Sequence, residues 1–176
     1  MGDAATDSTI PGQDILAGLL SQCADPVIKI THPPVHTVAE AQPYWDQIEG
    51  AHTKNLLLKD NRGKLWLVTM QAERRADLKA LTMLLGAKRV SFASAETLLA
   101  SLGVTPGAVT PLGLVNDTEH QVGFVLDKAL AEAGRITCHP LVNTATVSLS
   151  SRDLLTLLQG IGASVQVLDL DQPPAG

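Results

Sequence analysis

Lys54 and Asn55 stand side by side where an apolar segment begins, and their side chains could do chemistry together. Three leucines follow them at positions 56–58. A lysine ammonium can bind a phosphate, and an asparagine amide can donate a hydrogen bond to a carbonyl oxygen. The alternative is that Lys54 is a solvated lysine that prevents edge-to-edge pairing of strands.

Two further segments place polar residues among apolar ones. The segment 107–117 belongs to a stretch, 104–117, that has two glycines and two prolines and reads as a structured loop, and the segment 138–147 contains Cys138 next to His139. Neighbouring residues in a strand point to opposite faces, so we interpret Cys138 as a buried structural cysteine rather than a nucleophile activated by His139. Three such segments on apolar elements suggest one shared site.

Acyl transfer to water without a protein nucleophile suits a lysine, amides, a histidine and a glycine-proline loop. These groups can bind a phosphate, hydrogen-bond a carbonyl oxygen and position a water or a substrate hydroxyl. The sequence lacks the phosphate-loop, dinucleotide-binding, serine-hydrolase and zinc-protease motifs. His32 and His36 are separated by two prolines that forbid a helix, so we expect no metal site and no cofactor.

The apolar pattern predicts the elements that must position these residues. An unbroken leucine run is typical of a strand buried on both faces, and the turn at 61–63 predicts a hairpin with 64–70. A helix begins after Thr37, whose capping partner is Glu40, and is disturbed near Pro43. Further strands are expected at 27–31, 88–92, 122–126, 135–138, 144–149 and 165–168, and further helices at 13–23, 71–86, after Ser94, after Asp127 and after Ser150 or Ser151.

This order predicts an α+β fold with a mixed, curled, barrel-like sheet of about six to seven strands and helices packed outside it. We expect residues 1–176 to form a single domain with loose ends at about 1–11 and 171–176. An apolar fraction of 45% is ample for a core.

Composition narrows the range of partners. The net charge of −5 argues against broad adhesion to nucleic acid, and 3% aromatic residues cannot build a base-stacking platform of several rings. The sequence lacks the ~20 uninterrupted apolar residues of a membrane span and begins without a secretory pattern. We therefore expect a cytoplasmic protein that binds neither membrane nor DNA.

Four motifs in order resemble the signature segments of the YbaK and prolyl-tRNA-synthetase-associated editing domains. They lie at 53–60, 107–114, 116–117 and 139–145, and the likeness extends from about Ile10 to Leu170. Within that group they are most similar to the free-standing alanyl-tRNA(Pro) deacylases. The resemblance implies hydrolysis of a mischarged aminoacyl ester at the acceptor end of tRNA(Pro), with prolyl-tRNA synthetase as a candidate partner.

The resemblance also implies roles for particular residues. Lys54, Asn55 and His139 would be catalytic, with Lys54 charged and engaging the phosphate near the terminal adenosine while the 2′-hydroxyl of the tRNA assists attack. His36 departs from the apolar or aromatic residue expected of many relatives, which bears on the choice of amino acid. The substrate-binding residues would be Gly107, Ala108, Val109, Thr110, Pro111, Gly113, His36, Asn116 and Asn143.

The sequence leaves alternatives for the substrate, the function and the roles of single residues. A proline-shaped synthetase pocket rejects the smaller alanine by only ~1–3 kcal/mol, so a second site that excludes proline would complete the selection. Cysteinyl-tRNA(Pro) is an alternative substrate, and a non-catalytic module that binds tRNA or a synthetase is an alternative function. Asn116 could simply form a turn, Asn143 could cap a strand, and Gly107 and Pro111 could serve loop geometry alone.

Overall fold

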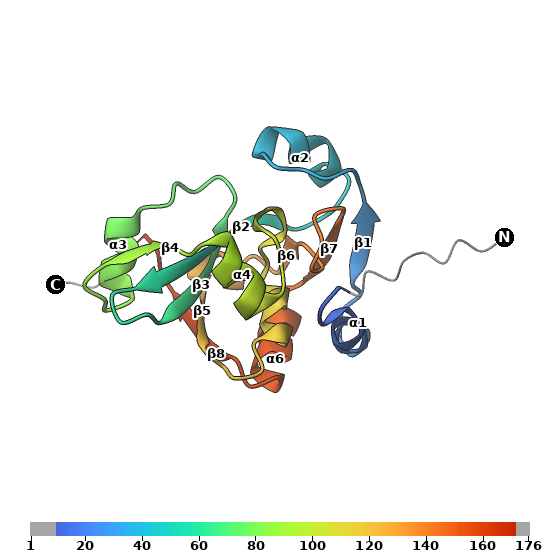
Figure 1. Cartoon of the computed structure of the whole chain (residues 1–176). Coiled ribbons are helices and arrows are strands. Elements are labelled where there is room, and N and C mark those ends of the chain that lie inside the picture. The colour runs from blue at the N-terminus through green and yellow to red at the C-terminus, as the bar shows by residue number, and fades with distance from the viewer. Residues whose placement is uncertain (1–9, 172–176) are drawn as a thin grey trace.

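The computed structural model describes residues 10–171, which are built on one mixed eight-stranded sheet (Figure 1). The strands follow the order β1-β7-β6-β2-β3-β5-β8, and β4 pairs with β2 beside this path. The expected α+β class is confirmed, with eight strands where about six to seven were expected. The strands are β1 (Ile28–Thr31), β2 (Ala51–Asp60), β3 (Leu65–Gln71), β4 (Val90–Phe92), β5 (Val122–Asp127), β6 (Arg135–Cys138), β7 (Ala145–Ser150) and β8 (Ser164–Leu168).

The sheet combines antiparallel hairpins with parallel crossovers. The pairs β2–β3 and β6–β7 are antiparallel, as the short turns between them predict. In the first turn the Asp60 carboxylate accepts from the main-chain N–H of Arg62 and Lys64, and Gly63 has a positive φ of 84°. The pairs β2–β6, β3–β5 and β5–β8 are parallel.

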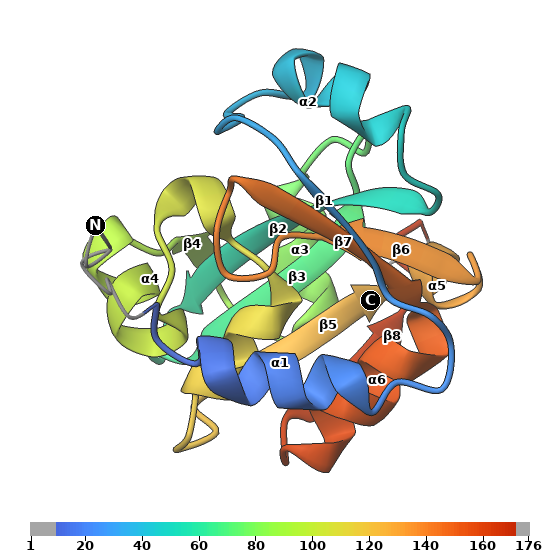
Figure 2. The same ribbon diagram turned by 90° about the vertical axis from the view of Figure 1, so that its right-hand side faces the viewer.

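Six α-helices and two 3-10 helices complete the described chain. Figure 2 shows α1 and α6 at one end of the molecule and α2 at the other. Side chains cap several of them: Thr37 accepts from the Glu40 N–H, and Ser150 accepts from the Asp153 N–H. The helices are α1 (Gln13–Ser21), α2 (Val38–Trp45), α3 (Leu78–Leu84), α4 (Ala95–Leu102), α5 (Lys128–Ala131), α6 (Ser151–Gly160), η1 (Pro106–Ala108) and η2 (Pro111–Asn116).

The boundaries of two helices differ most from the sequence expectation. Helix α2 continues through Pro43 to Trp45, because a proline removes a single main-chain donor and the next turn still closes from Asp46 N–H to Gln42 O. Helix α3 begins at Leu78 and not near Gln71, because β3 runs to Gln71 and Asp77 supplies the cap.

The central strand β2 is covered on both faces, as its leucine run predicts. Leu57 belongs to the larger core cluster, with Phe124 and Leu126, and Leu58 belongs to the second cluster, with Val125. Alternating residues of one strand therefore enter different cores. This double burial makes β2 a rigid support for the residues at its beginning.

The predicted loose ends at 1–11 and 171–176 lie almost entirely outside the described residues. At the margins, the Pro11 carbonyl accepts a hydrogen bond from Asn116, and Asp171 pairs with Arg74. None of the described helices has the length and apolar character needed to cross a membrane.

Candidate active site

A cavity of about 380 Å³ opens where β2 begins, and several predicted site residues line it. Lys54 and Asn55 come from β2, Gly107 comes from η1, and His139 follows β6. Parallel pairing of β2 and β6 explains part of this convergence. His52 lies opposite Thr137, and two residues further along each segment stand Lys54 and His139. Helix α2 forms another wall, and His36 precedes it.

Lys54 is a half-buried cation at this cavity. Burial lowers the pKa of its ammonium, and the nearby positive charge of Arg74 lowers that pKa further. None of the ion pairs within residues 10–171 includes Lys54. A phosphate bound at the cavity would raise the Lys54 pKa again and so stabilise the charged form.

His139 has one ring nitrogen fixed by the main chain. Its Nδ1 lies 2.8 Å from the carbonyl oxygen of Ala145, which can only accept, so Nδ1 carries the proton and Nε2 carries a lone pair when the ring is neutral. Burial lowers the pKa of His139, the bond to Ala145 raises it, and His32 at 6.2 Å between ring centroids lowers it. The side chain is therefore a neutral hydrogen-bond acceptor at neutral pH.

The Asn55 side chain connects β2 to the glycine-proline loop. Its Nδ2 donates to the Val109 carbonyl at 3.1 Å, and its Oδ1 accepts a hydrogen bond from the Thr69 hydroxyl. These two bonds fix the amide and the loop relative to each other. Asn55 is thus a positioning residue through its side chain, with one amide hydrogen left over.

Gly107 allows the loop to pass close to two predicted substrate-binding residues. A Cβ on Gly107 would lie 3.0 Å from Asn143 Nδ2 and 3.5 Å from His36 Nδ1. Asn143 is thus next to Gly107, although it borders a neighbouring hollow and not the main cavity. Val109 and His36 do line the main cavity.

The remaining predicted substrate-binding residues lie outside the lining of the main cavity. Ala108, Thr110, Pro111 and Gly113 are buried, and Thr110 hydrogen-bonds the Leu112 N–H. The Asn116 amide donates to the carbonyls of Pro11 and Leu102. In this structure these residues support the loop, while Gly107 and Val109 face the cavity.

Cys138 is a buried thiol, as the alternation of strand faces predicts. Burial raises its pKa to about 12, and a hydrogen bond with Thr110 only partly opposes that rise. A thiol with so high a pKa remains protonated and is a poor nucleophile. Within residues 10–171 no three His, Cys, Asp or Glu side chains gather as metal ligands.

Sequence reasoning missed the wall contributed by α2 and by the residues after β3. Trp45 and Ala72 line the cavity, and the Trp45 ring stacks on His52 at 4.4 Å with an interplanar angle of 6°. The capping box at Thr37 predicts where the helix begins, but no local pattern in the sequence predicts which face of that helix meets the sheet.

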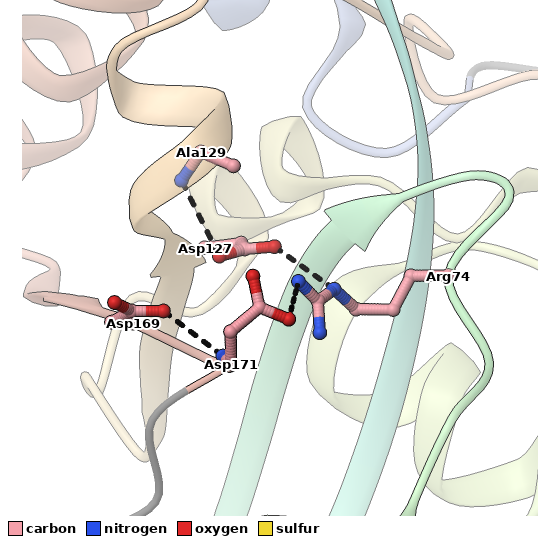
Figure 3. A network of polar contacts seen from close by, with 5 residues as sticks. All are labelled: Arg74, Asp127, Ala129, Asp169 and Asp171. Atoms are coloured by element: carbon pink, nitrogen blue, oxygen red, sulfur yellow. Dashed lines mark hydrogen bonds and ion pairs between the residues drawn. The ribbon is translucent and has the colours of Figure 1, made fainter.

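A charged cluster near Lys54 was also missed (Figure 3). Arg74 Nε lies 3.2 Å from the buried Asp127 Oδ2, without the alignment of a hydrogen bond, and Arg74 Nη2 lies 2.7 Å from Asp171 Oδ1. Asp127 also caps α5 through the Ala129 N–H. The cluster ties the segment after β3, which carries Ala72 to the cavity, to β5 and to the chain beyond β8.

Known proteins share this fold. A solved structure described as that of a candidate trans-editing enzyme for prolyl tRNA synthetase matches with a TM-score of 0.68 at 23% identity, over 90% of this chain and 96% of that one. A second solved structure, of hypothetical protein APE2540, matches with a TM-score of 0.66 at 22% identity, over 87% and 95%. These likenesses define the class of fold, a mixed α+β domain.

Sequence similarity then gives the family. The model described as the aminoacyl-tRNA editing domain matches residues 32–157. Prolyl-tRNA synthetase associated domain-containing protein 1 of Danio rerio is 40% identical over 144 residues, 81% of this chain and 78% of that protein. Prolyl-tRNA editing protein ProX of Acetoanaerobium sticklandii is 35% identical over 142 residues, 80% and 87%. The chain belongs to the aminoacyl-tRNA editing domain family, which confirms the resemblance drawn from its motifs.

Proposed function

We propose that this protein is a trans-acting deacylase that hydrolyses alanyl-tRNA(Pro) to alanine and tRNA(Pro). The observation that carries the proposal is that Lys54, Gly107 and His139, from three separate segments, line a single cavity. Membership of the editing-domain family and similarity to a prolyl-tRNA editing protein support the same reaction.

The cavity offers a role for each of these groups. The Lys54 ammonium binds the phosphate next to the terminal adenosine, and the wall at Gly107 holds the aminoacyl ester. A water, positioned with the help of the substrate 2′-hydroxyl, attacks the ester carbon. The bond between that carbon and the ribose oxygen breaks, and a proton from the water passes to that oxygen, which releases alanine and tRNA(Pro). His139 accepts a hydrogen bond through Nε2 and orients the attacking O–H.

Selection of alanine would follow from crowding. Gly107 and His36 line one wall of the cavity and Asn143 lies next to Gly107, so a bulkier aminoacyl group has to displace side chains there. Excluding the larger residue by overlap is the second step of a double sieve. Proline, the correct product of the synthetase, would be retained on its tRNA.

A substrate panel tests the proposal. Purified protein is mixed with alanyl-, cysteinyl-, seryl- and prolyl-tRNA(Pro), and the loss of each ester is followed in time. We expect rapid hydrolysis of alanyl-tRNA(Pro) and hydrolysis of prolyl-tRNA(Pro) slower by at least about 100-fold. Faster hydrolysis of the cysteinyl ester would make cysteinyl-tRNA(Pro) the substrate in place of alanyl-tRNA(Pro). Tight binding of all four esters without turnover would contradict a deacylase.

A further inference from the structure

A second, smaller groove adjoins the main cavity. It has a volume of about 150 Å³ and shares Asn55, Pro106 and Val109 with that cavity. Its other walls include Leu57 and Phe92. The two hollows are thus separated by one short stretch of loop and one residue of β2.

The edge of β2 that faces this groove is unpaired at Asn55. Toward β6 the ladder ends at His52, and toward β4 it begins at Leu58. On the β3 side, His52 O accepts from Ala72 N and Asp60 N donates to Lys64 O, so even-numbered residues direct their main-chain groups to β3.

The main-chain N–H and C=O groups of odd-numbered residues of β2 point away from β3. Leu57 O accepts from Ala93 N on the edge opposite β3. Asn55 has the same parity, so its main-chain N–H and C=O also point away from β3. Within residues 10–171 neither group has a hydrogen-bond partner on that edge. Partly buried main-chain groups are almost always satisfied, so a donor and an acceptor open side by side mark a place for a ligand.

The groove also offers an aromatic surface. Phe92 is 56% exposed, whereas Phe124 and Trp66 are buried. A planar base can stack on such a ring while one of its edges hydrogen-bonds the strand. The small volume and the single open residue suit one base and not an added peptide strand, which would need several consecutive open residues.

We propose that this groove binds the adenine base of the terminal nucleotide while its ribose presents the aminoacyl ester to the main cavity. This proposal rests on the proposed function. Adenine carries an amino donor beside a ring-nitrogen acceptor, which complements the C=O and N–H of Asn55. Cytosine has a similar edge, but only the terminal base is joined to the ribose that bears the ester. Asn55 then acts twice, through its side chain on the loop and through its main chain on the base.

Acceptor-stem microhelices with altered ends test the assignment. With the ribose held in the main cavity, a terminal inosine places an acceptor against the C=O and a donor against the N–H. We expect inosine to lower kcat/KM for the alanyl ester by at least about tenfold, and a purine riboside, which lacks only the amino group, to have a smaller effect. Replacing the penultimate cytidine with uridine should leave kcat/KM unchanged, and sensitivity there without sensitivity at the terminal base would overturn the proposal.

A matched pair of variants tests the stacking surface. Phe92→Ala should raise KM by on the order of tenfold, and Met83→Ala, which truncates an apolar side chain 45% exposed on α3, should not change it. Equal effects of both variants would contradict a base at Phe92. Equal melting temperatures of both variants and the wild type show that the fold is intact.

Binding of uncharged microhelices separates this proposal from the proposed function. Weaker binding of the inosine end than of the adenosine end supports the groove even if no ester is hydrolysed, in which case only the deacylase proposal fails. If the inosine and adenosine ends bind equally well and the alanyl ester is still hydrolysed, the proposal that the groove binds adenine fails and the deacylase proposal stands.

Discussion

Burial lowers the pKa of both Lys54 and His139, but the consequence differs for the two side chains. Desolvation disfavours the charged form of both side chains, so it lowers both pKa values. For His139 this reinforces a neutral ring whose Nε2 can accept a hydrogen bond. For Lys54 it leaves an ammonium poorly solvated, which strengthens its attraction to a phosphate in the cavity.

The histidine environment predicts how stability depends on pH. Burial is the largest cause of the lowered pKa of both His52 and His139, so their folded-state pKa values lie below the ordinary 6.5. Below pH 6.5 the unfolded chain binds more protons than the folded chain, and the free energy of unfolding falls as pH falls. Urea unfolding between pH 7.5 and about pH 5 should show this loss, before most carboxylates titrate. His139→Asn should make the dependence shallower, and an unchanged slope would contradict the assignment.

Gly107 should be sensitive to a single methyl group. Gly107→Ala introduces a Cβ 3.0 Å from Asn143 Nδ2, while no positive φ opposes alanine at this position. We expect the melting temperature to be nearly unchanged and kcat/KM for alanyl-tRNA(Pro) to fall about 10- to 100-fold, because the wall of the cavity moves. Gly18→Ala, in open space on α1, is the control and should keep full activity. Full activity of Gly107→Ala would remove Gly107 from the substrate wall.

At the scale of elements, the sequence predicted the strands and helix starts that are determined by neighbouring residues in the chain. The leucine run gave β2, and the side-chain caps at Thr37, Ser94 and Ser150 begin α2, α4 and α6 as expected. Contacts between distant elements had no such signal. The face of α2 that meets the cavity depends on the path from β1 over the sheet, and Arg74 lies in a segment that was expected to be helical.

The Arg74 cluster allows a comparison between a buried and an exposed carboxylate. Asp127 is 1% exposed and Asp171 is 70% exposed, and both lie close to Arg74. Asp127→Ala should reduce the free energy of unfolding by about 2–4 kcal/mol, because the variant loses the cap of α5 and a buried partner of Arg74. Asp171→Ala should cost less than about 1 kcal/mol because its carboxylate is solvated.

Urea unfolding of both variants at one pH checks this expectation. Asp127→Asn keeps a capping oxygen and so isolates the loss of charge. Equal stabilities of Asp127→Ala and Asp171→Ala would show that burial of the carboxylate does not determine the strength of this cluster.

At the scale of the whole molecule, the site depends on strand order. The residues at 54–55, 107–109 and 139 are far apart in the chain, and they meet because β6 lies beside β2 while Asn55 holds the loop at Val109. Their co-occurrence in sequence predicted a shared site, and the lining of the cavity matches for Lys54, Asn55, Gly107, Val109, His36 and His139. Sequence could not separate the loop residues that face the cavity from Thr110 and Asn116, whose hydrogen bonds hold the loop, because all of them lie within the one segment 107–117.

The central claim is that this cavity hydrolyses an aminoacyl ester with the help of the Lys54 charge. The most direct measurement is the single-turnover rate of alanyl-tRNA(Pro) hydrolysis by Lys54→Ala and by Lys59→Ala, an exposed lysine of the same strand outside the cavity. We predict a fall of at least about 100-fold for Lys54→Ala and a wild-type rate for Lys59→Ala. A wild-type rate for Lys54→Ala, or an equal fall for both variants, would contradict the account.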